Sequence, residues 1–333
     1  MDKDKVSLLT KLLETYGPSG NENLVREVIF NEINQYVDEI KTDRLGNLIA
    51  IKRGSGKKIM IAAHMDEIGV IITGIDENGY LRFANIGGVS PYVSLGQRVM
   101  FCDGLQGVVH MEHLEDIKQL KLEKMYIDIG AINREDALSK VNIGDSACFY
   151  KPFVQMGEAF VSKAMDDRIG CFIAIEALKQ IKNSPNEIYF VFTVQEEIGL
   201  RGAKTSAFGI DPDVGISVDI TDTGDTPKAK HMAVKMGSGP AIKIKDNYLL
   251  SHPAVKQLMI DTAKEHQIPY QLEVLEFGGT DSGAIHLTRG GVPSGVLSIP
   301  CRYAHTPCEM VSIKDVENSI KLLTKILEKE ILI

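Results

Sequence analysis

Two adjacent glutamates follow an apolar run near the middle of the chain. Residues 190–197 read FVFTVQEE, so Glu196 and Glu197 stand directly after a segment typical of a buried strand. Two neighbouring carboxylates repel each other unless a cation or a shared proton lies between them. The pair therefore indicates either a bound cation or a shared proton at this strand end, and the other acidic and histidine-containing segments must decide between the two.

Four further segments place histidine or acidic residues where apolar runs end. They are AAHMDEIG (62–69) with His64 and Asp66, SKAMDDRIGC (162–171) with Asp166 and Asp167, VGISVDITDTG (214–224) with Asp219, and SIPCRYAHTPCEM (298–310) with His305. In a strand, His64 and Asp66 would face the same side, so the carboxylate could orient the imidazole. Taken singly, each segment has a simpler explanation, such as a helix cap or a turn.

Together these residues predict a two-metal site. Ligand sites of open α/β sheets lie outside the carboxyl ends of the strands, where the side chains would converge. Two histidines and three or more carboxylates suit zinc or cobalt. One carboxylate could bridge two ions about 3.5–4 Å apart, which leaves a glutamate free to act as the base.

The elements that must position these residues alternate in type. Helical spacing is found in 5–14, in a segment after the turn GPSG (17–20), and in 167–182, 254–266, 281–287 and 314–330; strands are expected at 47–52, 58–65, 187–195, 214–219, 271–276 and 293–299. This alternation predicts an α/β fold with a mostly parallel mixed sheet between helices. Residues 67–161 instead show short strands broken by Gly, Asp and Asn, typical of a small β-barrel. We therefore expect a catalytic domain formed by 1–66 and 162–333, with 67–161 as an inserted β-rich domain.

Composition limits the classes of partner. The 333 residues carry a formal net charge of −8, which argues against a nucleic acid or an anionic membrane as partner. The first ten residues, MDKDKVSLLT, lack the apolar region of a signal peptide, and no apolar run approaches a membrane span. Five dispersed cysteines without a CxxC pair indicate reduced thiols and a cytoplasmic location.

Seven segments resemble one known family in the same order and with similar spacing. The blocks AAHMDEIG, KAMDDRIGC, VQEEIGLRGA, SVDITDTGDTP, GSGPAI, GGTDSGAIH and YAHTPCEM are similar to those of the M42 di-metal aminopeptidases of the TET type. This group includes glutamyl, leucyl and lysyl aminopeptidases, and some relatives are labelled endoglucanases. The resemblance extends over almost the whole chain. It implies a zinc-exopeptidase-like fold and the removal of N-terminal residues from peptides.

The resemblance also implies a role for each candidate residue. Asp166 would bridge two divalent ions, Glu197 and His305 would complete one site, and His64 and Asp219 would complete the other. Glu196 would be the general base and Asp66 would support His64. The family often has a cis peptide after the bridging aspartate, which would fall at Asp166–Asp167. Zinc or cobalt would be the metal, with manganese as a further candidate.

The inserted domain matches the family's dimerisation domain, which is described as PDZ-like. The resemblance therefore implies self-association as a dimer and a hollow tetrahedral dodecamer that admits short peptides. One departure lies in HMEHLEDIKQLKLEK (110–124), where relatives often have Pro-Pro-His-Leu. His113 keeps the His-Leu pair without the prolines, which bears on assembly and not on chemistry.

Some residues near the predicted site are ambiguous. Gly278 and Gly279 in FGGTDSGAIH would let the backbone approach a substrate. Asp281 could contribute to specificity or cap a helix. Arg201 could bind a substrate carboxylate or pair with an acid, and we favour the structural role.

Two alternatives to the aminopeptidase come from other classes. A carboxylate glycosidase of the endoglucanase type needs carboxyl groups about 5–9.5 Å apart on either side of a sugar, and it would keep its activity in EDTA. The chain has no Trp for stacking against sugars. A non-catalytic peptide-binding scaffold would hydrolyse no aminoacyl p-nitroanilide with any added metal.

Overall fold

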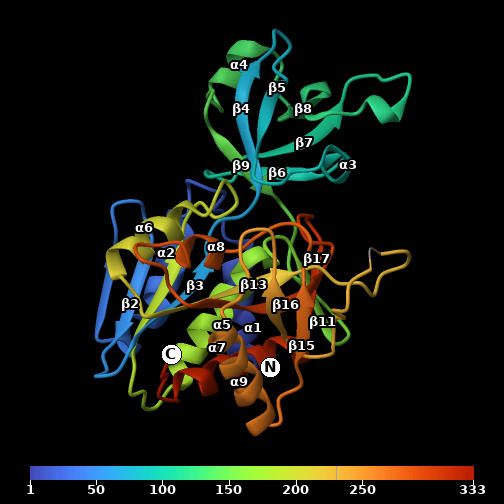
Figure 1. Ribbon diagram of the computed structural model, residues 1–333. Helices are drawn as coiled ribbons and strands as arrows, with labels where there is room; N and C mark the ends of the chain where they lie inside the picture. Colours follow the sequence, from blue (N-terminus) through green and yellow to red (C-terminus); the bar gives the residue numbers. More distant parts are fainter. Residues whose placement is uncertain (230) are drawn as a thin grey trace.

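The strands nearest the centre of the molecule are continuous apolar runs. β3 (Lys58–His64) reads KIMIAAH and β12 (Glu187–Thr193) reads EIYFVFT, and each is buried after its first residue. Strands show such runs when helices cover both faces of their sheet. The computed structural model, which describes residues 1–229 and 231–333, confirms the predicted α/β fold with a separate barrel (Figure 1).

The bounds of the elements follow the predicted pattern closely. The helices are α1 (Lys3–Glu14), α2 (Asn23–Ile33), α3 (Pro91–Ser94), α4 (Arg134–Leu138), α5 (Met165–Gln180), α6 (Arg201–Ile210), α7 (Pro253–Glu265), α8 (Ser282–Ile285) and α9 (Ile313–Leu327), with short 3-10 helices η1 (Asn34–Tyr36), η2 (Ile117–Gln119) and η3 (Leu122–Lys124). The remaining strands are β1 (Glu39–Thr42), β2 (Leu48–Lys52), β4 (Gly69–Ile75), β5 (Leu81–Ile86), β6 (Arg98–Phe101), β7 (Gln106–Met111), β8 (Met125–Asp128), β9 (Ser146–Phe149), β10 (Val154–Met156), β11 (Ala159–Ser162), β13 (Val214–Thr221), β14 (Ala241–Lys245), β15 (Gln271–Val274), β16 (Ser294–Arg302) and β17 (Glu309–Ser312).

The large sheet is mixed, with a parallel centre. Its order is β1-β2-β12-β3-β13-β16-β17-β11-β10, and β14 pairs with β16 and β15. The central strands β12, β3, β13 and β16 run parallel to one another, and antiparallel strands flank them on both sides. The carboxyl ends of the central strands therefore lie at one edge of the sheet.

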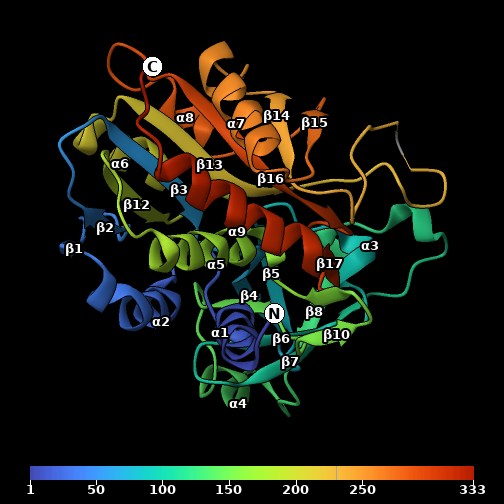
Figure 2. The same cartoon turned by 90° about the horizontal axis from the view of Figure 1, so that it is seen from below.

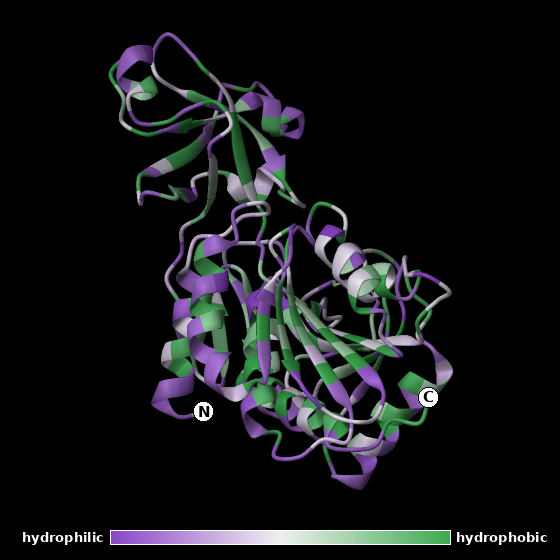
Figure 3. Ribbon diagram, turned by 90° about the vertical axis from the view of Figure 1, so that its left-hand side faces the viewer, coloured by the Kyte–Doolittle hydropathy of each residue, from purple (hydrophilic) through white to green (hydrophobic). Residues whose placement is uncertain are grey.

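Helices cover both faces of this sheet. Residues of α1, α2, α5, α7 and α9 join one apolar core, and residues of α6 and α8 join another on the opposite face. Figure 2 shows α5 and α9 side by side against the sheet. Every side chain of α5 from Met165 to Leu178 is buried, so this helix lies at the centre of the larger core. In Figure 3 the colour of hydrophobic residues is concentrated on the strands of the large sheet and on those of the barrel.

A closed six-stranded barrel stands apart from the sheet. Strands β4-β5-β8-β7-β6-β9 form it, and they enclose an apolar core of their own. Strands β10 and β11 follow the barrel and belong to the large sheet, where β10 pairs with β11 and β11 pairs with β17. The chain segments that enter and leave the barrel are joined by a buried ion pair, with Lys163 Nζ 2.7 Å from both carboxylate oxygens of Glu67. The domain limits at 67–161 remain a prediction.

Two differences from the predicted elements bear on the site. The strand expected over 187–195 ends at Thr193, because Gln195 has a backbone φ of 57° that a strand does not accommodate. Helix α6 lies between two predicted strands, in a segment where the sequence pattern indicated neither a helix nor a strand. Its sequence RGAKTSAFGI contains two glycines, which lower helix propensity and hide the pattern.

Candidate metal centre

The ends of the central strands bring the predicted residues together. Thr193, the last residue of β12, pairs in parallel with His64, the last residue of β3. Asp219 lies near the end of β13, opposite Ser298 of β16. These residues therefore meet at the edge of the sheet where open α/β folds bind ligands.

Asp166 lies between the two histidines. Its Oδ1 is 3.0 Å from Nε2 of His64, and its Oδ2 is 3.3 Å from Nε2 of His305. Oε1 of Glu197 is 3.5 Å from the same nitrogen of His305. The Asp166–Asp167 peptide bond is cis, as the resemblance implied. One carboxylate thus faces two imidazoles with different oxygens, which is the arrangement expected of a bridging ligand.

Asp219 lies on the His64 side of this arrangement. Ligand atoms of His64, Asp167 and Asp219 all lie within 4.8 Å of one another, as do those of His64, Asp166 and Glu197. Asp167 was not predicted as a ligand. Its oxygens accept the backbone N–H groups of His64 at 3.2 Å and of Gly170 at 3.1 Å, so it joins the end of β3 to the first turns of α5.

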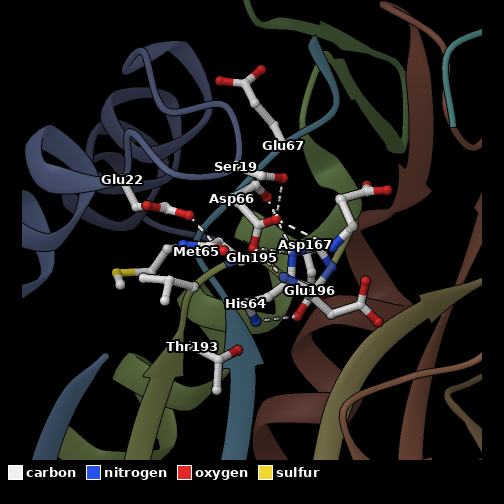
Figure 4. Close-up of polar contacts among 12 residues, drawn as sticks. Ser19, Glu22, His64, Met65, Asp66, Glu67, Asp167, Thr193, Gln195 and Glu196 are labelled. Atoms are coloured by element: carbon white, nitrogen blue, oxygen red, sulfur yellow. Dashed lines mark hydrogen bonds and ion pairs between the residues drawn. The ribbon is translucent and has the colours of Figure 1, made fainter. Parts of the chain in front are cut away.

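Asp66 anchors the loop that contains both glutamates (Figure 4). Its Oδ1 accepts the backbone N–H of Glu196 at 3.0 Å, and its Oδ2 accepts that of Glu197 at 3.2 Å and the hydroxyl of Ser19 at 2.6 Å. Asp66 Oδ1 is also 3.5 Å from Nδ1 of His64, whose nearer partner is the Asp66 backbone carbonyl at 3.1 Å. The buried carboxylate therefore positions a ligand loop as well as an imidazole.

Glu309 is a residue that the sequence reasoning missed. It is buried, and its carboxylate accepts the backbone N–H of His305 at 2.7 Å and that of Asp166 at 3.1 Å. It therefore ties two candidate ligands from distant segments to each other. Glu309 lies in the block YAHTPCEM, so its acidic character near His305 was the available signal.

The inserted barrel also contributes to the centre. The backbone carbonyl of Gly88, in the loop after β5, accepts a hydrogen bond from Nδ1 of His305 at 3.2 Å. A metal-binding histidine commonly donates from its other nitrogen in this way, which fixes the ring orientation. A Cβ at Gly88 would lie 2.3 Å from Nδ1 of His305, and a Cβ at Gly87 would lie 2.9 Å from Glu197 Oε2. No local pattern in the sequence indicated this contact.

The electrostatics of the centre favour bound cations. Burial and neighbouring acids raise the pKa of the Glu196 and Asp219 carboxyls well above the usual range, and burial raises that of Glu197 to about 7. Burial lowers the pKa of His305, but Asp166 and Glu197 outweigh this effect and raise it to about 11. These carboxyls bind protons where no other positive charge balances them. Divalent cations would replace these protons.

A cavity of about 550 Å³ opens onto the centre, and its wall includes His64, Asp166, Glu196, Glu197, Asp219 and His305. Gly278 and Gly279, predicted near the substrate, also line it. Asp281 is buried behind the wall and accepts the hydroxyl of Thr193 at 2.5 Å, and it makes no side-chain cap on α8.

Arg201 lies apart from the ligands. It is exposed and donates to the side-chain oxygen of Gln195 at 3.3 Å. This partner is an amide oxygen and not the acid that the sequence analysis considered, so the role of Arg201 stays a prediction.

The donor set suits two divalent ions. Imidazole nitrogens of His64 and His305 and a carboxylate oxygen of Glu197 lie close to Asp166, and such atoms are donors that zinc, cobalt and manganese accept. The M42 glutamyl aminopeptidase family model matches residues 46–322. The chain belongs to the M42 glutamyl aminopeptidase family.

Known proteins resemble this chain over nearly its full length. It is 57% identical to a candidate aminopeptidase of Acetivibrio thermocellus over 97% of this chain and 98% of that protein. It is 37% identical to the lysyl aminopeptidase of Pyrococcus furiosus, over 97% of this chain and 96% of that protein. Among solved structures, an aminopeptidase from the archaeon Desulfurococcus kamchatkensis matches with a TM-score of 0.95 and 38% identity. The match covers 98% of this chain and 94% of that chain.

Two other solved structures bear on assembly and on the alternative activity. One is the Pyrococcus horikoshii TET1 peptidase, which can assemble into a tetrahedron or a large octahedral shell. It matches with a TM-score of 0.88 and 33% identity, over 98% of this chain and 99% of that chain. A Thermotoga maritima protein described as an endoglucanase matches with a TM-score of 0.83 and 34% identity over 96% of each chain. None of the described helices is long and apolar enough to cross a membrane.

Proposed function

We propose that this protein is a di-metal aminopeptidase that removes N-terminal residues from short peptides. The family membership supports the activity. The observation on which the proposal depends is the position of Asp166, whose two oxygens face His64 and His305 separately. A single-metal site does not need a carboxylate shared in this way.

The ligands divide into two sets that share one residue. Asp166, His64 and Asp219 would hold one ion, and Asp166, Glu197 and His305 would hold the other. We choose Asp166 over Asp167 as the shared ligand, because both Asp167 oxygens already accept backbone N–H groups. Zinc or cobalt suits this set, and manganese is a further candidate.

Glu196 would move the protons in this reaction. When bound, the ions would polarise the scissile carbonyl and make a water molecule more acidic. Glu196 accepts one proton from that water, and the water oxygen forms a bond to the carbonyl carbon. The carbon–nitrogen bond then breaks, and Glu196 gives the proton to the departing amine. The Asp66 carboxylate accepts the backbone N–H of Glu196 and so keeps this glutamate in place.

The excess of acids explains a preference for chain ends. The wall of the cavity contains Glu196, Glu197, Asp166 and Asp219, and Asp222 lies nearby in the same wall. Two divalent ions leave some of this negative charge available for the ammonium group of a peptide's N-terminus. An internal peptide bond offers no such group.

The test separates the base from the ligands. Glu196→Gln should lower the hydrolysis of an aminoacyl p-nitroanilide by at least about 100-fold, as expected for loss of a general base. The metal content of the purified variant, measured by mass spectrometry, should stay at two ions per chain. Loss of an ion together with activity would show that Glu196 is a ligand and that the roles are exchanged.

We further propose that the chain self-associates through its barrel into a dimer and a tetrahedral dodecamer. The related assemblies support this, as do exposed apolar side chains on the barrel, with Ile132 83% and Ile143 62% exposed. The five cysteines are free, which agrees with the cytoplasmic location expected from the sequence.

A further inference from the structure

The cavity has an apolar wall beside the metal centre. Its members are Leu200, Ile220, Tyr248, Leu275 and Phe277, together with Gly278 and Gly279. The ring-bearing residues of this wall are open to solvent, since Tyr248 is 62% exposed and Phe277 39%. Exposed rings gathered at a concave site form a surface that a ligand would cover.

Tyr248 is held in this wall by two glycines of the FGGTDSG segment. A Cβ at Gly279 would lie 2.1 Å from Cδ2 of the ring, and a Cβ at Gly283 would lie 2.7 Å from Cβ of Tyr248. The turn before it is fixed by Asp246, whose Oδ1 accepts the Tyr248 backbone N–H at 2.8 Å. The ring therefore lies against bare backbone where it lines the cavity.

The fixed charges behind this wall are occupied with one another. Lys243 lines the cavity but is 1% exposed. Its ammonium lies 2.9 Å from Oε1 of Glu273 and 3.5 Å from Oδ2 of Asp246, and Thr221 donates to the same Glu273 oxygen.

We propose that this wall is the pocket for the N-terminal side chain and that it selects aliphatic and aromatic residues, with the Tyr248 ring on Gly279 setting its size. The inference depends on the proposed aminopeptidase function. A peptide whose scissile carbonyl lies between His64 and His305 has its first side chain next to that centre. The adjoining wall is apolar, so leucine, methionine and phenylalanine would bury their side chains there.

Polar side chains gain nothing comparable in this pocket. A glutamate, glutamine or lysine side chain would lose water on entry. The ammonium of Lys243 is covered and lies 2.9 Å from Glu273 and 3.5 Å from Asp246, so two buried carboxylates already balance its charge.

The first experiment uses the metal-loaded enzyme and compares aminoacyl p-nitroanilides whose side chains are of similar length. The kcat/KM for methionine p-nitroanilide should exceed those for the glutamine, glutamate and lysine derivatives by at least about 10-fold, the scale expected for hydrophobic-pocket discrimination. Dipeptides that vary only the second residue should differ much less. Calorimetry of free methionine and free glutamine binding to metal-loaded Glu196→Gln protein gives a readout that does not need turnover.

The second experiment changes the wall. Tyr248→Ala should lower the methionine-to-glutamine ratio of kcat/KM by about 10-fold, mainly through KM, whereas Tyr248→Phe should keep it, because the hydroxyl plays no part. Tyr248 is largely exposed, so folding is not at risk. Gly279→Ala should push the ring into the cavity and lower kcat/KM for phenylalanine more than for alanine derivatives. Gly209→Ala is the matched control, since a Cβ there meets no atom within 4 Å.

Three outcomes would overturn the inference while leaving the proposed function in place. They are equal or better hydrolysis of glutamate or lysine derivatives, an unchanged ratio in Tyr248→Ala, and selectivity that follows the second residue. If no aminoacyl derivative is hydrolysed with any metal, the proposed function fails and the inference falls with it.

Discussion

Gly88→Ala should weaken one metal site from outside the α/β domain. The added Cβ would lie 2.3 Å from Nδ1 and 2.7 Å from Cε1 of His305. Gly88 does not have a positive φ, so alanine can adopt its backbone conformation. The ring must therefore move by about 1 Å to reach an ordinary contact distance.

The displaced ring can move without harm to the fold. The His305 side chain is 40% exposed, so it can swing towards solvent, and we expect a change in unfolding free energy of no more than about 0.5 kcal/mol. The metal site tolerates a displaced His305 ring less well than the fold does. Loss of the hydrogen bond to the Gly88 carbonyl and the shift of Nε2 should lower the affinity for one ion by about 10–100-fold.

Cobalt titrated into metal-free protein and followed by calorimetry measures this effect. Wild-type protein should bind two ions per chain, and Gly88→Ala should keep one tight site and weaken the other, with a matching loss of kcat/KM at limiting metal. Gly74→Ala in β4 is the control, because the nearest atom to its Cβ would lie at 3.8 Å. Two sites of unchanged affinity in Gly88→Ala would refute the idea that the barrel positions His305.

Three further predictions concern the same centre. First, the pKa of His305 is raised to about 11 in the metal-free protein, so its proton stabilises the folded state below pH ~6.5, and this contribution is lost as the pH rises towards 11. Metal binding at pH 7.5 should therefore release protons and become tighter as the pH rises; calorimetry in buffers of different ionisation enthalpy measures the release, and its absence would contradict this assignment. Second, Glu309→Gln places an amide where two backbone N–H groups donate, so metal affinity should fall by about 10-fold, and an unchanged affinity would mean that Glu309 is not a positioning residue. Third, EDTA should abolish peptide hydrolysis and zinc, cobalt or manganese should restore it, whereas a carboxylate glycosidase would keep its activity on a β-glucan.

The alternation of helices and strands could be read from local pattern. Strands β3, β12, β13 and β16 could be located from their apolar sequences, because a strand buried on both faces must be apolar along its length. The short strands of the barrel were equally visible. Helix α6, with two glycines, and the short strands β14 and β17 were not predicted, since their local propensity is weak and the surrounding structure determines them.

The convergence of the ligands could also be expected from the sequence. His64, Glu197 and Asp219 stand at or just after strand ends, and parallel strands bring their carboxyl ends to one edge. The individual roles came from the family resemblance. The distances agree with Asp166 as the shared ligand, and the assignment of each role remains a proposal.

What the sequence by itself determined was the set of elements and the kind of residue at each strand end, because both depend on local pattern. Only the tertiary structure decided what holds those residues in place. Asp66 secures the glutamate loop, Glu309 joins His305 to Asp166, and the Gly88 carbonyl of the barrel orients the His305 ring. These contacts join residues up to 217 positions apart, and all three use a backbone group that every residue has, so the sequence does not show which residues they join.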